Sequence, residues 1–324
     1  MPLALMVAAV MSGATSLPEL AASVDSLPVS RTAVVVGVSL QYLDWGGAGE
    51  ALVFLPPACE TPHIYGDIAP ALASAFRVVG LTTRGCGLSS RAEAYDLDSQ
   101  LRELEGFLDL LGVDRATIAG FSVSAGKAVR FARLFPSRVT RLVLFDPVYS
   151  YVAPGLEEQM AAAITALVGG DGGASPELFR RHHEAWELGS WSSALDRNLQ
   201  ESFFARPDGS LESRADERWW PAFRADMMAG RYFETHTNHP TLALFAINLE
   251  RERLKQLDEA TRVTLAPLIE DTESTRREQI EDFRESGRDI RIVEMPNTAH
   301  YCFVHRPEEV LEHLWAFLSA GRAR

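Results

Sequence analysis

The stretch Ile118–Gly126, IAGFSVSAG, holds two serines one residue apart between two glycines. The run ATIA before Gly120 predicts a short buried strand, and the run AGKAVRFARLF predicts a helix that ends before a proline. A sharp turn from strand to helix needs small residues two positions before and after its centre, because the backbone doubles back on itself. Gly120 and Ser124 flank Ser122, whereas Ser122 and Gly126 flank Ser124, so spacing alone leaves both centres open.

The length of the strand favours Ser122 as the centre of this turn. The run ATIA ends at Gly120, so the helix is expected to begin near Val123 with its backbone N–H groups directed at Ser122. A helix N-terminus carries partial positive charge and can stabilise a developing oxyanion. Ser124 then falls in the first helical turn. The alternative is a serine-rich helix start in which the hydroxyl only caps the helix, and the rest of the chain has to decide between the two.

Strand and helix patterns alternate along most of the chain. Runs rich in β-branched and aromatic residues predict strands at 33–36, 38–45, 51–57, 77–83, 115–120, 141–147, 241–247 and 289–296. Apolar residues at helical spacing predict helices at 67–76, 97–113, 125–135, 250–286 and 307–318. The alternation predicts an α/β fold with a mostly parallel sheet covered by helices on both faces. Ligand sites in such sheets lie outside the carboxyl ends of the strands.

Three motifs carry a resemblance to a known family. They are LTTRGCGLSS at 81–90, GFSVSAGKAVRFARLFPSRV at 120–139 and VEMPNTAHYCFVHRPEEVLEHLWAFL at 293–318. In that order they are similar to the Arg-Gly-x-Gly-x-Ser loop, the nucleophile elbow and the histidine loop with its closing helix in the α/β-hydrolase fold superfamily. The resemblance covers about residues 33–319 and implies that fold. Two positions depart from the family pattern. Ser124 stands where glycine is usual, and PPAC at 56–59 stands where the loop after the third strand usually begins His-Gly.

The resemblance implies a catalytic triad with Ser122 as the nucleophile. A serine hydroxyl is a poor nucleophile until a base takes its proton. His300, on the loop after the last strand, is the expected base, whereas His305 already belongs to a segment that leads into the last helix. The base in turn needs a carboxylate that holds its tautomer and stabilises the imidazolium.

Two carboxylates compete for that role, and a different group is a third option. Asp146 directly follows an apolar strand at the active edge of the sheet, and its alternative role is a turn cap before Pro147. Glu250 follows the strand whose loop carries the acid in most family members, but the RERLK after it is typical of an exposed helix start. Some relatives place the acid at the earlier strand end, so Asp146 is favoured.

The oxyanion hole requires two backbone N–H donors. Val123, directly after the nucleophile, supplies one by its position. The second is expected from the PPAC loop, where Pro56 and Pro57 have no N–H group to donate. That leaves Ala58, with Cys59 as the alternative.

The expected organisation has three parts: a leader at 1–30, a core at 31–146 and 241–324, and a helical cap at 147–240 inserted between core strands. The first residues contain an apolar run similar to the centre of a signal peptide. No Lys or Arg precedes this run, so a cytoplasmic location is favoured and export is the alternative.

Composition narrows the possible partners. The chain has 324 residues and a formal net charge of −13, which would repel nucleic acid and anionic lipid surfaces. The expected partner is a small-molecule substrate, with neither nucleic acid nor membrane, and the oligomeric state is left open. No phosphate loop or metal-ligand cluster is visible, so neither a cofactor nor a metal is expected. The three cysteines, an odd and sparse set, are interpreted as reduced thiols, and histidines such as His183 as cap surface.

The leading hypothesis is a carboxylesterase-like serine hydrolase. It would cleave a small to medium apolar ester or related acyl substrate through an acyl-enzyme. The same residues also allow amide or peptide hydrolysis, carbon–carbon hydrolysis or a cofactor-free lyase reaction. A non-catalytic small-molecule receptor is the alternative from a different class. Epoxide hydrolases and dehalogenases of this fold are disfavoured because they carry Asp where Ser122 stands.

Overall fold

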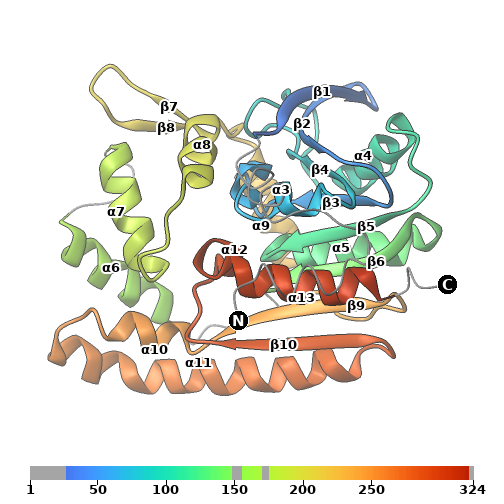
Figure 1. Ribbon diagram of the computed structural model, residues 1–324. Helices are drawn as coiled ribbons and strands as arrows, with labels where there is room; N and C mark the ends of the chain where they lie inside the picture. The colour runs from blue at the N-terminus through green and yellow to red at the C-terminus, as the bar shows by residue number, and fades with distance from the viewer. Residues whose placement is uncertain (1–26, 148–154, 170–174, 321–324) are drawn as a thin grey trace.

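One eight-stranded sheet forms the centre of the molecule (Figure 1). The structure, a computed structural model, describes residues 27–147, 155–169 and 175–320. The strands lie in the order β1-β2-β4-β3-β5-β6-β9-β10. Their bounds are β1 Val29–Val35, β2 Val38–Gly46, β3 Ala51–Leu55, β4 Arg77–Leu81, β5 Ala116–Phe121, β6 Val139–Phe145, β9 Thr241–Ile247 and β10 Ile290–Pro296. Within this sheet, only the pairs β1–β2 and β2–β4 are antiparallel, so the predicted mostly parallel sheet is confirmed.

Helices cover both faces of this sheet. On one face lie α4 (Leu97–Leu110) and α5 (Val123–Leu134), and on the other lie α13 (Pro307–Ser319) and three short elements. The short elements are η1 (Pro62–Tyr65), α3 (Ala69–Leu72) and α12 (Cys302–His305), and a further short turn, η2 (Pro136–Arg138), follows α5. In place of the helix predicted at 67–76, the structure has α3, which is only one turn long. It ends at a turn in which later backbone N–H groups donate to the carbonyl groups of Ala71 and Leu72. The chain then enters β4.

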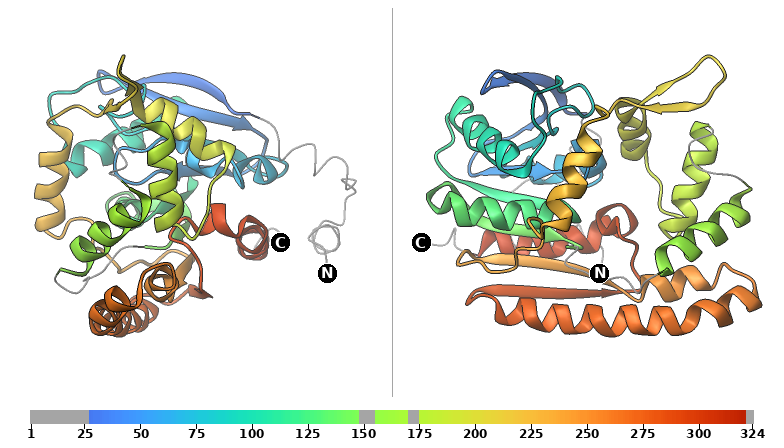
Figure 2. Two further views of the ribbon diagram at one scale, coloured as in Figure 1. Left: turned by 90° about the vertical axis from the view of Figure 1, so that its left-hand side faces the viewer. Right: turned by 180° about the vertical axis from the view of Figure 1, so that it is seen from behind.

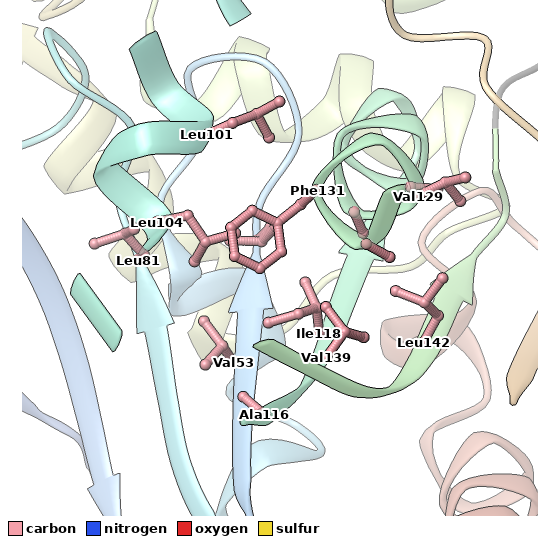
Figure 3. Packing of buried hydrophobic residues seen from close by; sticks show 14 of the residues in the cluster. Val53, Leu81, Leu101, Leu104, Ala116, Ile118, Val129, Phe131, Val139 and Leu142 are labelled. Atoms are coloured by element: carbon pink, nitrogen blue, oxygen red, sulfur yellow. The ribbon is translucent and has the colours of Figure 1, made fainter. Parts of the chain in front are cut away.

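The two layers of core follow the alternation of side chains along each strand. In β3, Val53 and Leu55 face the layer beneath α4 and α5, whereas Leu52 and Phe54 face the opposite layer. Figure 3 shows the first layer, where Val53 and Ile118 lie beneath the Phe131 ring of α5. Central strands that bury both faces read as continuous apolar runs, which is why β3, β5 and β6 were recognisable in the sequence.

The segment between β6 and β9 contains helices and one hairpin. Its described part up to residue 213 projects beyond the carboxyl ends of the strands, whereas the helix at 219–228 packs against the core layer that contains α5 (Figures 1 and 2). Its described elements are α6 (Leu156–Val168), α7 (Pro176–Trp186), α8 (Ser193–Ser202), β7 (Phe203–Ala205), β8 (Leu211–Ser213) and α9 (Trp219–Met228). This is the segment predicted as the cap, and its residues 148–154 and 170–174, like residues 1–26 of the predicted leader at 1–30, lie outside the described part.

The helical stretch predicted at 250–286 is two helices, α10 (Leu249–Leu254) and α11 (Glu259–Glu285). The chain breaks between them because the Asp258 side chain caps α11 by accepting from the Thr261 N–H. The long helix α11 runs along β10 and continues past the sheet to α6 (Figures 1 and 2). There Leu265 and Ile269 pack against α6. Among the described residues, no helix is long and apolar enough to span a bilayer.

Candidate active site

Ser122 occupies the sharp turn between β5 and α5. Its backbone has φ 55° and ψ −126°, a region that non-glycine residues rarely adopt. The neighbouring strand holds the turn, because the Ser122 N–H donates to the Phe145 carbonyl at 2.9 Å. The side chain is 8% exposed and stands at the helix N-terminus, as the sequence predicts.

Ser124 has a different role from Ser122. Its Oγ donates to the Pro56 carbonyl oxygen at 2.7 Å, so its hydroxyl joins the first turn of α5 to the loop after β3. The small residue before the turn is also explained: a Cβ on Gly120 would lie 2.2 Å from the Ser124 carbonyl oxygen. Of the two serines, Ser122 is the one at the centre of the strained turn.

His300 and Asp146 contact each other directly. His300 Nδ1 lies 2.5 Å from Asp146 Oδ2, although the residues are 154 positions apart in the chain. The His300 ring also packs against Phe121, with ring centroids 4.5 Å apart. Since Phe121 immediately precedes Ser122, the imidazole lies beside the strand end that carries the serine.

Hydrogen bonds hold Asp146 in place, as one holds Ser122. It is 1% exposed, its φ is 36°, and its N–H donates to the Leu244 carbonyl at 2.7 Å. Its Oδ1 accepts from the Ala246 N–H at 2.9 Å and from a guanidinium N–H of Arg276. Burial alone would raise the pKa of this carboxyl group, but Arg276, His300 and the Ala246 N–H together bring it below its ordinary value. Asp146 is therefore an ionised carboxylate at neutral pH.

Glu250 and His305, the alternatives for the acid and the base, make other contacts near the site. Glu250 is in the first turn of α10 and pairs with Arg253 at 3.7 Å, a residue three positions along the same helix. His305 Nδ1 accepts from the Ala299 N–H at 3.1 Å and so shapes the loop that carries His300. The described hydrogen-bond partner of the His300 side chain is Asp146, the carboxylate that the sequence favoured over Glu250.

The loop after β3 lies against this turn and carries a feature that the sequence analysis got wrong. Ala58 has φ 43°, and Cys59 forms a disulfide with Cys86 on the loop after β4. The expectation of three reduced thiols is therefore incorrect for this pair, while Cys302 is free and buried. Sequence spacing gave no signal, because the two cysteines meet only when β3 and β4 pair side by side.

Further polar residues that the sequence analysis missed surround His300. Tyr301 Oη pairs with a carboxyl oxygen of Glu60, and the Tyr301 N–H donates to Glu187 at 3.2 Å. Burial raises the pKa of Glu60 to about 7, against the lowering effects of Tyr301 and His300. His183, expected on the surface, packs instead against the Tyr301 ring at 4.9 Å between centroids. Burial lowers the pKa of His183 to about 4, so it is neutral at pH 7.

A pocket of about 290 Å³ opens beside the acid and the base. It is lined by Asp146, His300 and Arg276 together with residues of α6, α7 and α10, among them Met160 and Trp186. Among the described residues, no group of three or more His, Cys, Asp or Glu side chains could hold a metal ion.

Comparison with known sequences gives one family and several relatives. The model of the alpha/beta hydrolase family matches residues 52–313. N-formylmaleamate deformylase of Pseudomonas putida is 34% identical over 113 residues, which are 34% of this chain and 42% of that protein. A 2-hydroxy-6-oxononadienedioate/2-hydroxy-6-oxononatrienedioate hydrolase of the same species is 33% identical over 147 residues, 43% of each chain. The chain thus matches about two fifths of the length of these relatives.

Comparison with solved structures extends the likeness to most of the chain. E-2-(acetamidomethylene)succinate hydrolase superposes with a TM-score of 0.61 at 18% identity, covering 90% of this chain and 99% of that one. At this identity the likeness concerns the fold alone, and it agrees with the fold predicted from the three motifs.

Proposed function

Because the chain belongs to the alpha/beta hydrolase family, we propose that it is a serine hydrolase whose triad is Ser122, His300 and Asp146. The observation that carries this proposal is the 2.5 Å contact between His300 Nδ1 and Asp146 Oδ2, at the sheet edge where Ser122 occupies its strained turn. The contact fixes the tautomer in which Nε2 is free to accept a proton.

The proposed reaction begins at a substrate carbonyl carbon. Ser122 Oγ attacks this carbon while its proton passes to His300 Nε2, and Asp146 stabilises the resulting imidazolium. The bond to the leaving group then breaks, its electron pair leaves with that group, and His300 returns the proton to it. Water, deprotonated by His300, cleaves the remaining acyl-enzyme and frees Ser122.

The oxyanion formed in the first step needs hydrogen-bond donors that are already directed at it. We assign the backbone N–H groups of Val123 and Ala58 to this role. The hydrogen bond from Ser124 Oγ to the Pro56 carbonyl supports the assignment, because it holds the loop that carries Ala58 against the helix turn that carries Val123. One such donor contributes about 3–4 kcal/mol to transition-state stabilisation.

The names of the relatives favour a leaving group that is attached through carbon or nitrogen, whereas the sequence led us to expect the oxygen atom of an ester. Of the relatives described above, one is named a deformylase of an N-formyl compound and the other a hydrolase of oxo-dienedioates and oxo-trienedioates. We therefore propose a small oxo or N-acyl compound as the substrate class. A carbon leaving group must be stabilised as an enolate by conjugation, so the substrate needs a second carbonyl group or a diene next to the cleaved bond.

The test combines active-site labelling with a substrate panel. A fluorophosphonate probe should label wild-type protein and Ser124→Ala on Ser122, as shown by peptide mass spectrometry, and should fail to label Ser122→Ala. Turnover is then compared for a 1,3-diketone, an N-formyl amide and p-nitrophenyl esters of increasing chain length. Faster turnover of the diketone or the formamide supports the substrate class, and ester turnover alone would return the assignment to an esterase. A folded protein that the probe never labels would be a receptor.

A further inference from the structure

The Asp146 carboxylate has a partner that the triad does not require. Arg276, in the C-terminal half of α11, forms an ion pair with Asp146 Oδ1, while His300 Nδ1 contacts Oδ2. We propose that Arg276 is a positioning residue that holds Asp146 and extends to lower pH the range in which His300 acts as a base. This inference rests on the proposed function, because it concerns the acid and the base of the same triad.

The ion pair is enclosed rather than solvated. The Asp146 side chain is 1% exposed and the Arg276 side chain 17% exposed, so water screens their interaction weakly. Arg276 Nε has no hydrogen-bond partner among the described residues, and the described ion pair of its guanidinium is the one with Asp146. The guanidinium pairs with one oxygen of Asp146 and the imidazole contacts the other, while Glu250 also acts electrostatically on Arg276.

This geometry determines the sign of the effect on His300. A carboxylate favours the protonated form of the imidazole that it contacts, and a second cation on the same carboxylate opposes that preference. Arg276 reduces the field of Asp146 and also adds a like charge near the imidazolium. The imidazole therefore stays unprotonated, and competent as a base, to a lower pH than Asp146 alone would allow.

Other ionisable groups lie near the same imidazole, and a substitution at position 276 keeps their side chains in the chain. They are Glu60 on the loop after β3, His183 and Glu187 at the end of α7, Glu157 on α6, Glu250 and Arg253 on α10, and the phenol of Tyr301. Because Glu250 also acts on Arg276, a comparison of variants at position 276 reports the Arg276 charge together with that interaction.

The experiment compares three variants with wild-type protein. Arg276→Gln removes the charge, Arg276→Lys keeps it, and Arg277→Gln removes the charge of a neighbour on α11 whose side chain is 64% exposed. The acid limb of kcat/KM is measured with whichever carbonyl compound is turned over. In parallel, the low-field proton resonance of His300 Nδ1–H is followed by NMR against pH without substrate. Circular dichroism melts report whether each variant is folded.

We expect Arg276→Gln to move both pH midpoints upward by on the order of one pH unit. Arg276→Lys should stay close to wild type, as should Arg277→Gln. Equal midpoints in wild type and Arg276→Gln would overturn the inference, as would equal shifts in the Gln and Lys variants, because a purely packing role does not depend on charge.

Chemical rescue keeps the test decisive if the glutamine variant folds poorly. Arg276→Ala leaves space next to the 290 Å³ pocket that Arg276 lines, so millimolar guanidinium can reach Asp146. Guanidinium should return the NMR midpoint of Arg276→Ala toward that of wild type, and no return would contradict the inference. The NMR titration needs no turnover. Failure of probe labelling at Ser122 would therefore reject the proposed function separately from the role of Arg276.

Discussion

At the scale of single residues, backbone strain is concentrated where the chemistry is proposed. Non-glycine residues with positive φ follow the strands β3, β5, β6, β9 and β10 at the carboxyl edge of the sheet, namely Ala58, Ser122, Asp146, Asn248 and Asn297, and Val36 follows β1 in the same way. Each such conformation costs on the order of 1–3 kcal/mol and persists only where the surrounding structure imposes it. Here the neighbouring strands impose it, since Ser122, Asp146 and Asn297 each donate an N–H to the carbonyl of an adjacent strand.

The partly buried carboxyl group of Glu60 beside this edge predicts how stability depends on pH. The pKa of Glu60 is raised from 4.5 to about 7 in the folded protein. The folded state therefore holds a proton that the unfolded chain releases at lower pH. The resulting stabilisation is complete below pH 4.5 and is lost as pH rises through about 7. Relative to Glu60→Gln, the wild-type free energy of unfolding should fall by roughly 1–3 kcal/mol between pH 5 and 8 in urea titrations.

The glutamine variant is the matched control, because it keeps the size of the side chain and cannot ionise. Two parallel curves of unfolding free energy against pH would show that Glu60 titrates normally.

At the scale of elements, the proposed site consists of loops that follow parallel strands. A hydrogen bond from the Ser124 hydroxyl holds the loop after β3 against the start of α5. Ala58 in that loop has φ 43°, which proline cannot adopt, so Ala58→Pro would disrupt the loop as well as remove an N–H donor. The hydrogen bond from Ser124 is the better place to probe how the two elements are held together.

Ser124→Ala should therefore lower activity more than it lowers stability. Loss of one buried hydrogen bond costs about 0.5–1.5 kcal/mol of unfolding free energy. Displacement of the oxyanion loop should reduce kcat/KM by roughly ten- to a hundredfold. Ser286→Ala is the control, because its hydroxyl donates to the Thr235 carbonyl at 3.0 Å in another part of the chain. If both variants lose activity equally, the bond to Pro56 has no special role.

At the scale of the whole molecule, long-range contacts join parts that are distant in sequence. The Cys59–Cys86 disulfide connects loops 27 positions apart. The helix α11 runs from α6 to the sheet (Figure 1). Its Phe283 belongs to the core layer that contains α5, and its Leu265 packs against α6. Arg276 lies between these two contacts, so the same helix supplies the second cation on Asp146.

The disulfide should stabilise the whole fold, because a crosslink restricts the unfolded chain. For a loop of 27 residues the expected gain is about 3–4 kcal/mol. Reductant should lower the Tm of wild-type protein and leave the Tm of Cys59→Ser/Cys86→Ser unchanged. Cys302→Ala, which removes the free buried thiol, should respond to reductant as wild type does. Mass spectrometry that finds three free thiols under oxidising conditions would contradict the disulfide itself.

The sequence alone determined the fold, the order of its elements and the position of the serine turn. These features depend on local patterns. Central strands read as apolar runs because both their faces are buried, and the turn at Ser122 requires a residue as small as Gly120 within a few positions. The family motifs lie within continuous segments, so they too could be recognised without coordinates.

Only the tertiary structure decided which side chains meet. Asp146 directly follows β6, His300 lies on the loop after β10, and Arg276 lies on α11. Cys59 meets Cys86 because two strands pair side by side. The choice between Asp146 and Glu250 stayed open in the sequence because both follow strands that end at the same edge. The physical reason is that ion pairs and disulfides depend on distances across the sheet, and these distances leave no periodic trace along the chain.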